Sequence, residues 1–298
     1  MVLNSYNKKI IENKALGESM GIVELNQQYY YRRYIEDVTK LSKKYSEKLR
    51  VTIEGRTIDN RKILSFFAGN GLKHVLLTGG VHGRESNNTI VLMYLLEKFL
   101  DNPREEYTLC VMPLLNPDGY IIATESFAAI QNRNIQEQAK NEGMFWQEWK
   151  GNGRGIDINR NFPSLYWKKK EQEQFPGSEE ETRALMRVCN RYHFDLYLDF
   201  HSRGEEIYYH RQSMDNAYNK RQKFLAEKME QLSGYALVTP VRELDMKTGG
   251  GNTVHYTSEI FGIPSFTIET MPEDSGFPAD ISFQKNVYHQ IKELPFVI

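Results

Sequence analysis

The chain has 298 residues and a formal charge of −1, because 38 Lys and Arg residues are balanced by 39 Asp and Glu residues. This balance argues against a nucleic-acid-binding protein, which normally carries a clustered excess of basic residues. Hydrophobic residues make up 40% of the chain, enough for a substantial core. No apolar run approaches the roughly 20 residues that cross a membrane. We therefore expect a folded protein that binds neither nucleic acid nor a membrane.

The N-terminal segment shows weak, polar patterning. It has early lysines but lacks the apolar core of roughly 7–15 residues that an export signal contains. Cytoplasmic residence is therefore the default expectation, with release or non-classical export as the alternative. We expect residues 1–27 to form an N-terminal extension and residues 28–298 to form one domain.

The first regular elements begin near Tyr30. Apolar residues at Tyr34, Val38, Leu41 and Tyr45 follow the spacing of one helix face, which predicts a helix. Two short runs follow, RVTIEG and KILSFFAG, separated by polar residues. Their alternation predicts two strands of a hairpin.

A strand, a helix and a second strand follow. The run HVLLTGGV (74–81) is apolar and closed by glycines, as in a strand buried on both faces of a sheet. Residues 89–100 have helical length and spacing, and TLCVMPLL (108–115) predicts the next buried strand. This order indicates a strand-helix-strand unit.

The second half of the chain continues the alternation. Ser178 and Glu181 form a capping-box pattern that predicts the start of a helix. Cys110 and Cys189 lie in apolar stretches, which predicts buried free thiols rather than a disulfide or metal pair. Further predicted elements are the strand FDLYLDFHS, a helix over 215–232, the strand IPSFTIET and a closing helix SFQKNVYHQIKEL. Together they predict a single α/β domain with a central mixed, largely parallel sheet flanked by helices.

His82 and Glu85 stand three residues apart where a buried strand gives way to a helix. Side chains there converge in the crevice beyond the carboxyl ends of the strands, and both residue types bind zinc. A His-x-x-acid pair, however, occurs by chance roughly once in a chain of this composition. The pair alone is therefore weak evidence for a metal site.

His201 strengthens the metal hypothesis because it ends the strand FDLYLDF as His82 follows HVLLTGGV. One sheet would then present both imidazoles at the same edge. Two His and one Glu leave tetrahedral zinc one open position, the arrangement of a catalytic site. The alternative is that each histidine is a hydrogen-bonded core residue.

Glu269 is the candidate general base. It lies near the end of the apolar strand IPSFTIET, where an unpaired charge is costly unless a metal or a partner uses it. A carboxylate beside zinc can take a proton from water and return it to the leaving amine. The alternative is an acid at the sheet edge that pairs with a surface Arg or Lys.

The segment GIDINRNF (155–162) contains a polar cluster. Arg160 can form two parallel hydrogen bonds to a carboxylate, with Asn159 donating beside it, which suits a substrate with a free acid. Asp157 can accept the second ring hydrogen of a metal-bound histidine. The alternative for Arg160 is a solvated loop residue.

Five blocks in this order resemble the zinc carboxypeptidase family, the carboxypeptidase A-like metallopeptidases. The resemblance runs from about Tyr30 to the C-terminal helix. The blocks are HGRE (82–85), NPDGY (116–120), GIDINRNF (155–162), FHS (200–202) and SFTIE (265–269). The resemblance implies the fold of that family and one Zn²⁺ per chain, held by His82, Glu85 and His201, with Glu269 as general base.

The resemblance also implies roles for the remaining polar residues of these blocks. Asn159 and Arg160 would bind a substrate carboxylate, Asp157 would hold His82, and Arg84 would contribute to the cleft. Three stretches are most similar to bacterial γ-D-glutamyl-meso-diaminopimelate peptidases, which cut peptidoglycan stem peptides. They are EWKGNGRGIDINRNFPSLYW, DFHSRGEEIYYH and GGGNTVHYTSEIFGIPSFTIE.

The chain departs from the carboxypeptidase A pattern at three positions. Lys150 is the cation offered where the family has an arginine that polarises the scissile carbonyl. The position of the family's mobile tyrosine falls at Lys247, which would face a substrate carboxylate or lie solvated at the surface. The pocket position falls at Val254, next to His255, and neither residue predicts an acidic or basic pocket.

These patterns predict a zinc metallopeptidase that hydrolyses an amide bond next to a free carboxylate in a peptide or muropeptide. The bond expected is that between γ-D-Glu and meso-diaminopimelate in cell-wall peptides, with Glu269 as base and Lys150 steadying the oxyanion. One alternative is a carboxypeptidase for α-linked C-terminal residues. Another is a catalytically silent zinc-binding or peptide-binding module. The sequence predicts no particular oligomeric state.

Overall fold

The computed structural model describes residues 21–141, 143–169, 175–243 and 251–298. Its strands form one sheet in the order β1-β2-β4-β3-β5-β8-β6-β7. The strands are β1 Leu49–Arg56, β2 Lys62–Ala68, β3 Lys73–Thr78, β4 Tyr107–Met112, β5 Leu196–Ser202, β6 Glu206–Tyr208, β7 Ala236–Leu237 and β8 Ser265–Thr270. The helices are α2 Tyr31–Lys44, α3 Asn87–Asp101, α4 Pro117–Glu125, α5 Arg133–Asn141, α6 Glu180–Arg191, α7 Asn216–Ser233, α8 Thr253–Phe261 and α9 Phe283–Ile291.

The sheet is mixed, with a parallel centre. Strands β4, β3, β5 and β8 run parallel to one another, whereas β1 with β2, β2 with β4, and β6 with β8 pair antiparallel. The predicted hairpin and strand-helix-strand unit are both present. The single α/β domain with a mixed sheet is therefore confirmed, and the carboxyl ends of β3, β5 and β8 lie together.

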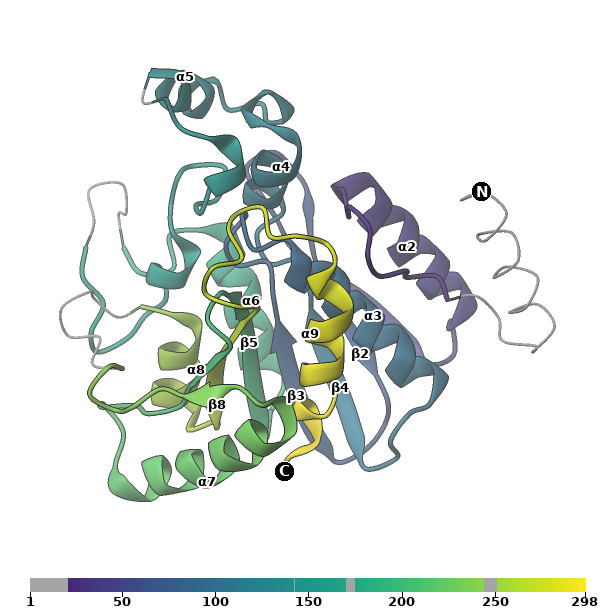
Figure 1. Cartoon of the computed structure of the whole chain (residues 1–298), viewed down its shortest axis with the longest axis vertical. Coiled ribbons are helices and arrows are strands. Elements are labelled where there is room, and N and C mark those ends of the chain that lie inside the picture. The colour runs from purple at the N-terminus through teal and green to yellow at the C-terminus, as the bar shows by residue number, and fades with distance from the viewer. Residues whose placement is uncertain (1–20, 142, 170–174, 244–250) are drawn as a thin grey trace.

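Helices cover both faces of the sheet (Figure 1). In β3, Val75 and Leu77 join a core that includes residues of α2, α3, α7 and α9. Leu76, between them, joins a second core with residues of α6 and α8. This alternation explains why the β3 run is apolar throughout, since a strand buried on both faces has no solvent side.

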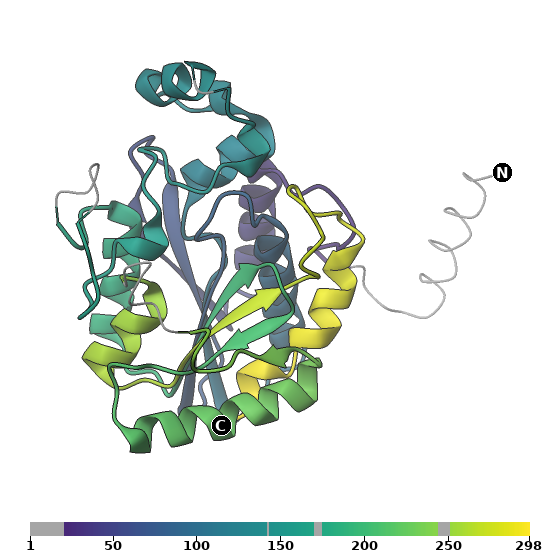
Figure 2. The ribbon, with the colours of Figure 1, turned by 60° about the vertical axis from the view of Figure 1, so that its left-hand side comes forward.

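The ends of the molecule differ (Figure 2): α4 and α5 lie at one end and α7 at the other. The chain before α2 packs on this body, because the backbone amides of Ile22 and Val23 donate to the Glu97 carboxylate at 2.8 Å.

No helix in the described part of the chain is both long and apolar enough to span a membrane. Cys110 and Cys189 are buried free thiols, as predicted.

The predicted capping box at the start of α6 is wrong. The helix begins at Glu180, and its N-cap residue, Glu179, forms no side-chain capping bond. Ser178 instead donates to Glu179 at 2.8 Å, and the carboxylate of Glu181 accepts from Asn152 at 3.2 Å. Ser178 also accepts from Asn161 Nδ2 at 3.0 Å, so Asn161, Glu179 and Asn152 occupy the groups that would form the local cap.

Helices α4 and α8 had no counterpart among the predicted elements. Residues from Pro117 to Ala123 in α4, and from Thr253 to Ser258 in α8, are all buried. A helix buried all round lacks the apolar stripe that a sequence pattern detects. Strands β6 and β7 were also not predicted, since each spans three residues or fewer.

Candidate active site

The loop after β3 and the end of β5 supply the candidate metal ligands. β3 ends at Thr78, earlier than predicted, so His82 and Glu85 lie in the connection to α3 rather than at the strand end. His201 lies within β5, which pairs parallel with β3. Neighbouring parallel strands thus bring the three side chains to one edge of the sheet.

The three candidate ligands converge tightly. Their donor atoms all lie within 4.8 Å of one another, and each residue is at most 5% exposed. His82 Nδ1 lies 2.8 Å from Glu85 Oε1, and His201 Nδ1 lies 3.0 Å from Glu85 Oε2. The structure therefore brings together the residues predicted to bind a metal.

The opposite nitrogens of both rings bind aspartates. His82 Nε2 donates to Asp157 at 3.1 Å, and His201 Nε2 donates to Asp199 at 2.8 Å. Each Nδ1 of a neutral ring is then left with its lone pair, and the two Nδ1 atoms face each other at 3.2 Å. Facing lone pairs repel unless a cation lies between them, so this donor set fits a bound divalent metal such as zinc.

Charges within this cluster shift the pKa values of its members. Burial raises the pKa of Glu85, but the His82 and His201 imidazoles outweigh it and hold that pKa well below its usual value. Burial lowers the pKa of His201, but Asp199 and Glu85 raise it well above its usual value. The carboxylates of the cluster therefore stabilise a positive charge at this position, either a proton or a metal ion.

Glu269 lies on β8 directly beside His201 of β5 in the strand register. Its Oε2 atom is buried without a hydrogen-bond partner among the described residues. Burial raises the pKa of Glu269 to about 8; His201 opposes this shift, and Glu85 and Asp199 add to it. A carboxylate that holds no partner and sits beside the ligand cluster is positioned to take up a proton.

The 157–160 segment joins the same cluster. Besides accepting from His82, Asp157 pairs through Oδ2 with Lys150 Nζ at 2.8 Å. Asn159 Nδ2 lies 3.4 Å from His201 Nε2, and Asn159 Oδ1 accepts from the Thr253 amide at 3.1 Å. These contacts bring Asp157, Asn159 and Lys150 to the ligands.

A cavity of about 280 Å³ opens beside Glu269. Both Asn159 and Arg160 line it, as does Val254, the expected pocket position. Besides Arg160 and Glu269, the lining includes charged residues that were not predicted: Arg211 is only 2% exposed and pairs with Glu243 at 2.7 Å. The pocket is therefore charged, which Val254 and His255 did not indicate.

The predicted site residues also include Arg84 and Lys247. Arg84 does not line this cavity; its guanidinium carbon lies 4.5 Å from the centre of the Phe277 ring. Lys247 lies outside the described residues. Arg84 therefore lies apart from the cavity that contains Arg160.

Several residues of the site were not predicted. Asp199 accepts a hydrogen bond from His201 and so holds its ring. The sequence pattern that could have predicted this is an acidic residue two positions before a histidine in an apolar strand, since such residues lie on the same strand face. Arg211 and Glu243 carried no such signal, because they lie 32 residues apart in the sequence.

Comparison with known proteins gives the family. The zinc carboxypeptidase family model matches residues 33–291, most of the chain. The chain belongs to the zinc carboxypeptidase family. The predicted family is thereby confirmed, and His82, Glu85 and His201 are the residues that fit its zinc.

Individual members of this family resemble the chain to different extents. It is 24% identical, over 72% of its length, to γ-D-glutamyl-L-diamino acid endopeptidase 1 of Lysinibacillus sphaericus. The first curated relatives are aligned with the chain over only about 60% of their own length.

Solved structures share the fold of this zinc carboxypeptidase family member. Bovine thrombin-activatable fibrinolysis inhibitor superposes with a TM-score of 0.75 at 16% identity, covering 91% of this chain and 96% of that one. Murein-tripeptide amidase MpaA from Escherichia coli O157 superposes with a TM-score of 0.54 at 19% identity, covering 82% and 91%. At these identities the likeness concerns the fold.

Proposed function

We propose that the protein is a zinc-dependent metallopeptidase that hydrolyses the amide bond between γ-D-Glu and meso-diaminopimelate in peptidoglycan stem peptides. One observation carries the catalytic part of this proposal. Three buried donors converge, and a carboxyl oxygen of Glu269 that bonds to no described residue lies on the adjacent strand. Such a set matches metal-assisted hydrolysis.

Each residue of the site has a task in this reaction. When bound by His82, Glu85 and His201, zinc polarises a carbonyl and acidifies water. Glu269 accepts the proton of the attacking water and returns it to the leaving amine. Lys150, whose side chain is 38% exposed, remains beside Asp157 and offers a positive charge to the developing oxyanion.

The charged cavity supports the substrate assignment. The Asn159–Arg160 pair suits the free carboxylate next to the scissile amide, because guanidinium binds carboxylate through two hydrogen bonds. The far end of diaminopimelate carries an ammonium and a carboxylate, which match Glu243 and Arg211. An apolar C-terminal side chain would leave this buried ion pair facing a hydrocarbon.

The comparisons agree with this substrate class. The Lysinibacillus relative is a γ-D-glutamyl-L-diamino acid endopeptidase, and the Escherichia coli neighbour is a murein-tripeptide amidase. The activity of the relative supports cleavage at a diamino acid. Together with the charged cavity, these likenesses favour wall peptides over ordinary α-linked peptides.

The test is cleavage of L-Ala-γ-D-Glu-meso-diaminopimelate by zinc-loaded and chelator-treated protein. We expect product from the loaded protein, loss of product after zinc removal, and recovery on adding zinc back. Glu269→Gln should reduce kcat by roughly 10²–10⁴-fold while keeping one zinc per chain. The matched control is Glu230→Gln, an exposed acid on α7.

Two outcomes contradict the proposal. Cleavage that persists after complete zinc removal would exclude the mechanism. Faster cleavage of α-linked C-terminal residues than of the γ-linked peptide would favour an ordinary carboxypeptidase and exclude the wall-peptide assignment.

A further inference from the structure

Two arginines that form no ion pair with any described residue stack on one aromatic ring. The guanidinium carbons of Arg84 and Arg203 lie 4.5 and 5.0 Å from the centre of the Phe277 ring. Arg84 stands between His82 and Glu85 in the chain, and Arg203 follows His201 by two residues. Both cations are therefore tied by short backbone segments to the ligand cluster.

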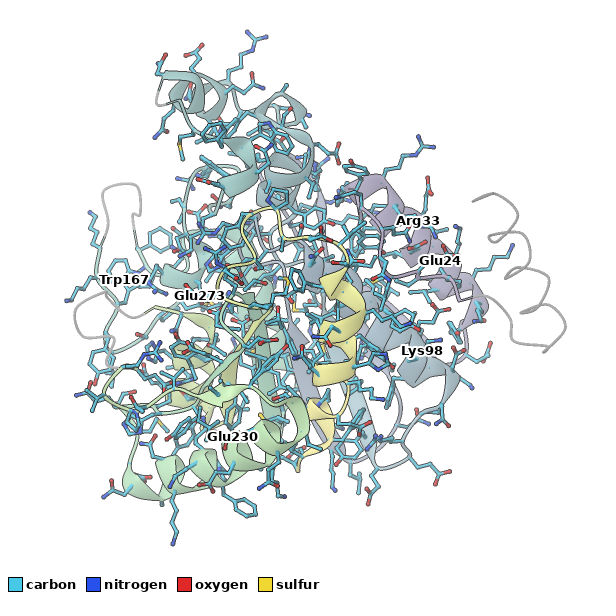
Figure 3. The ribbon with its side chains drawn as sticks, in the orientation of Figure 1. Glu24, Arg33, Lys98, Trp167, Glu230 and Glu273 are labelled. Carbon is cyan, nitrogen blue, oxygen red and sulfur yellow. The ribbon has the colours of Figure 1, made fainter. Side chains whose placement is uncertain are left out.

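No carboxylate of the described residues forms an ion pair with either arginine, although those of Glu206 and Glu273 lie near Gly204, next to Arg203. Within the described ranges, neither Arg84 nor Arg203 forms an ion pair, and Arg84 Nε is buried without a hydrogen-bond partner. Glu273, labelled in Figure 3, lies in the same loop as Phe277 but is exposed and bonds neither arginine. Two cations held on one ring without an anion repel each other, so a bound carboxylate would stabilise the pair.

The loop that carries Phe277 is anchored. It joins β8 to α9 and arches above α9 (Figure 1). The Gly204 amide donates to the Met271 carbonyl at 2.8 Å, and Asn87 Nδ2 donates to the Asp280 carbonyl at 3.1 Å. These bonds tie the loop to the segment after His201 and to the start of α3, so the site is preorganised.

The arginine pair is separate from the cavity beside Glu269, because Arg84, Arg203 and Phe277 do not line it. The proposed function assigns that cavity to the leaving diaminopimelate. Because the pair lies outside that cavity but on the segments that carry His82, Glu85 and His201, it is available to the other part of the substrate, which supplies the scissile carbonyl. A γ-linked D-Glu carries a free α-carboxylate there, whereas an α-linked peptide has only a neutral amide.

We propose that Arg84 and Arg203, held on Phe277, bind the α-carboxylate of the γ-linked D-glutamyl residue on the acyl side of the cleaved bond. This inference rests on the proposed function and adds a determinant of specificity to it. The site would select peptides whose D-Glu is free over those in which it is amidated to D-isoglutamine. The two residues differ by one charge at nearly equal size.

The test compares kcat/KM for L-Ala-γ-D-Glu-meso-diaminopimelate and for its D-isoglutamine counterpart. The parent protein should prefer the carboxylate peptide by roughly 10- to 100-fold, the range for a lost charge-assisted hydrogen bond. Arg203→Gln should bring the ratio of the two values close to one. Arg203→Lys keeps the charge without the planar fork and should keep part of the preference.

A matched control is Arg50→Gln. Arg50 also stacks on an aromatic ring, 4.2 Å from the centre of Phe67, but on the edge strand β1. Its replacement should leave the ratio unchanged. Calorimetry in a Glu269→Gln background should show the same preference in affinity, independent of turnover.

The outcomes separate the inference from the proposed function. Equal cleavage of the two peptides by the parent protein would overturn the inference while the proposed function stands. If Arg203→Gln lowered kcat/KM by the same factor for both peptides, the inference would also be overturned, since that pattern reflects a structural role of Arg203. Absence of cleavage of either peptide would overturn both.

Discussion

His82 and His201 each use both ring nitrogens, and this decides what their site can bind. The Nε2 atoms donate to Asp157 and Asp199, which fixes the tautomers. The Nδ1 atoms then lie beside Glu85 in a buried cluster, where a cation would offset the repulsion between their lone pairs and the carboxylate. At this scale the aspartates matter as much as the ligands, because they orient the rings before a metal arrives.

Asp199 gives a direct test of that orientation. Its carboxylate is buried and accepts from His201, Thr78 and Thr253. Replacement by Asn removes the charge that holds the ring and should weaken zinc binding roughly 10- to 100-fold. Zinc affinity is measured by competition with a chromophoric chelator.

Asp274→Asn, at an exposed position, is the control for this measurement. Far-UV circular dichroism of the metal-free Asp199→Asn protein separates a binding defect from misfolding. Unchanged zinc affinity in a folded variant would contradict the orienting role of Asp199.

The loop between β3 and α3 is the element on which the site depends. It carries His82 and Glu85, and its Gly83 and Arg84 amides donate to the carbonyls of Lys150 and Trp149. At Gly83, an added Cβ would lie 2.1 Å from the Gly119 carbonyl oxygen of α4. The loop therefore fits against α4 only with glycine at this position.

Gly83→Ala should displace this loop and move His82 away from its partners. We expect a loss of about 1–3 kcal/mol in the free energy of unfolding, as for overpacking, together with weaker zinc binding. Denaturant unfolding and zinc competition measure the two effects. Ser86→Ala is the control, since Ser86 lies in the same loop and its side chain forms no capping bond.

A Gly83→Ala variant with parental stability and zinc affinity would show that the loop tolerates displacement. That result would contradict the view that contact with α4 fixes the ligand geometry.

Most elements with a clear apolar period were predictable, whereas helices buried all round were not. Helix α2 follows its sequence pattern closely because it has one buried and one exposed side, and the β1–β2 hairpin is present where two short apolar runs predicted it. Helices α4 and α8 are buried all round and show no such period. Burial by neighbouring elements, rather than local propensity, decided these segments.

Over the whole molecule, a buried carboxylate makes stability depend on pH. Glu181 is 2% exposed, and burial raises its pKa to about 7, with Asp118 and Glu179 adding to the shift. A carboxyl pKa higher in the folded than in the unfolded state stabilises the protein fully at low pH. This contribution is lost as pH rises from about 4.5 to about 7.

Glu181→Gln should therefore increase the free energy of unfolding above pH 7, by about 2–3 kcal/mol. At pH 4.5 the difference between parent and variant should vanish. Urea unfolding over this range, with both proteins zinc-free, measures it, and the exposed Glu47→Gln is the control. A constant difference at all pH values would contradict the assignment to Glu181.

The sequence alone determined the α/β class, the main strands and helices, and the candidate ligands His82, Glu85 and His201. The apolar period of each element and the order of the five sequence blocks can be recognised without knowledge of the fold. Only the tertiary structure decided the tautomers of the rings, the Arg211–Glu243 pair in the cavity and the stacking of Arg84 and Arg203 on Phe277. Those contacts depend on strand order and register, which packing on both faces of the sheet sets, so no local pattern encodes them.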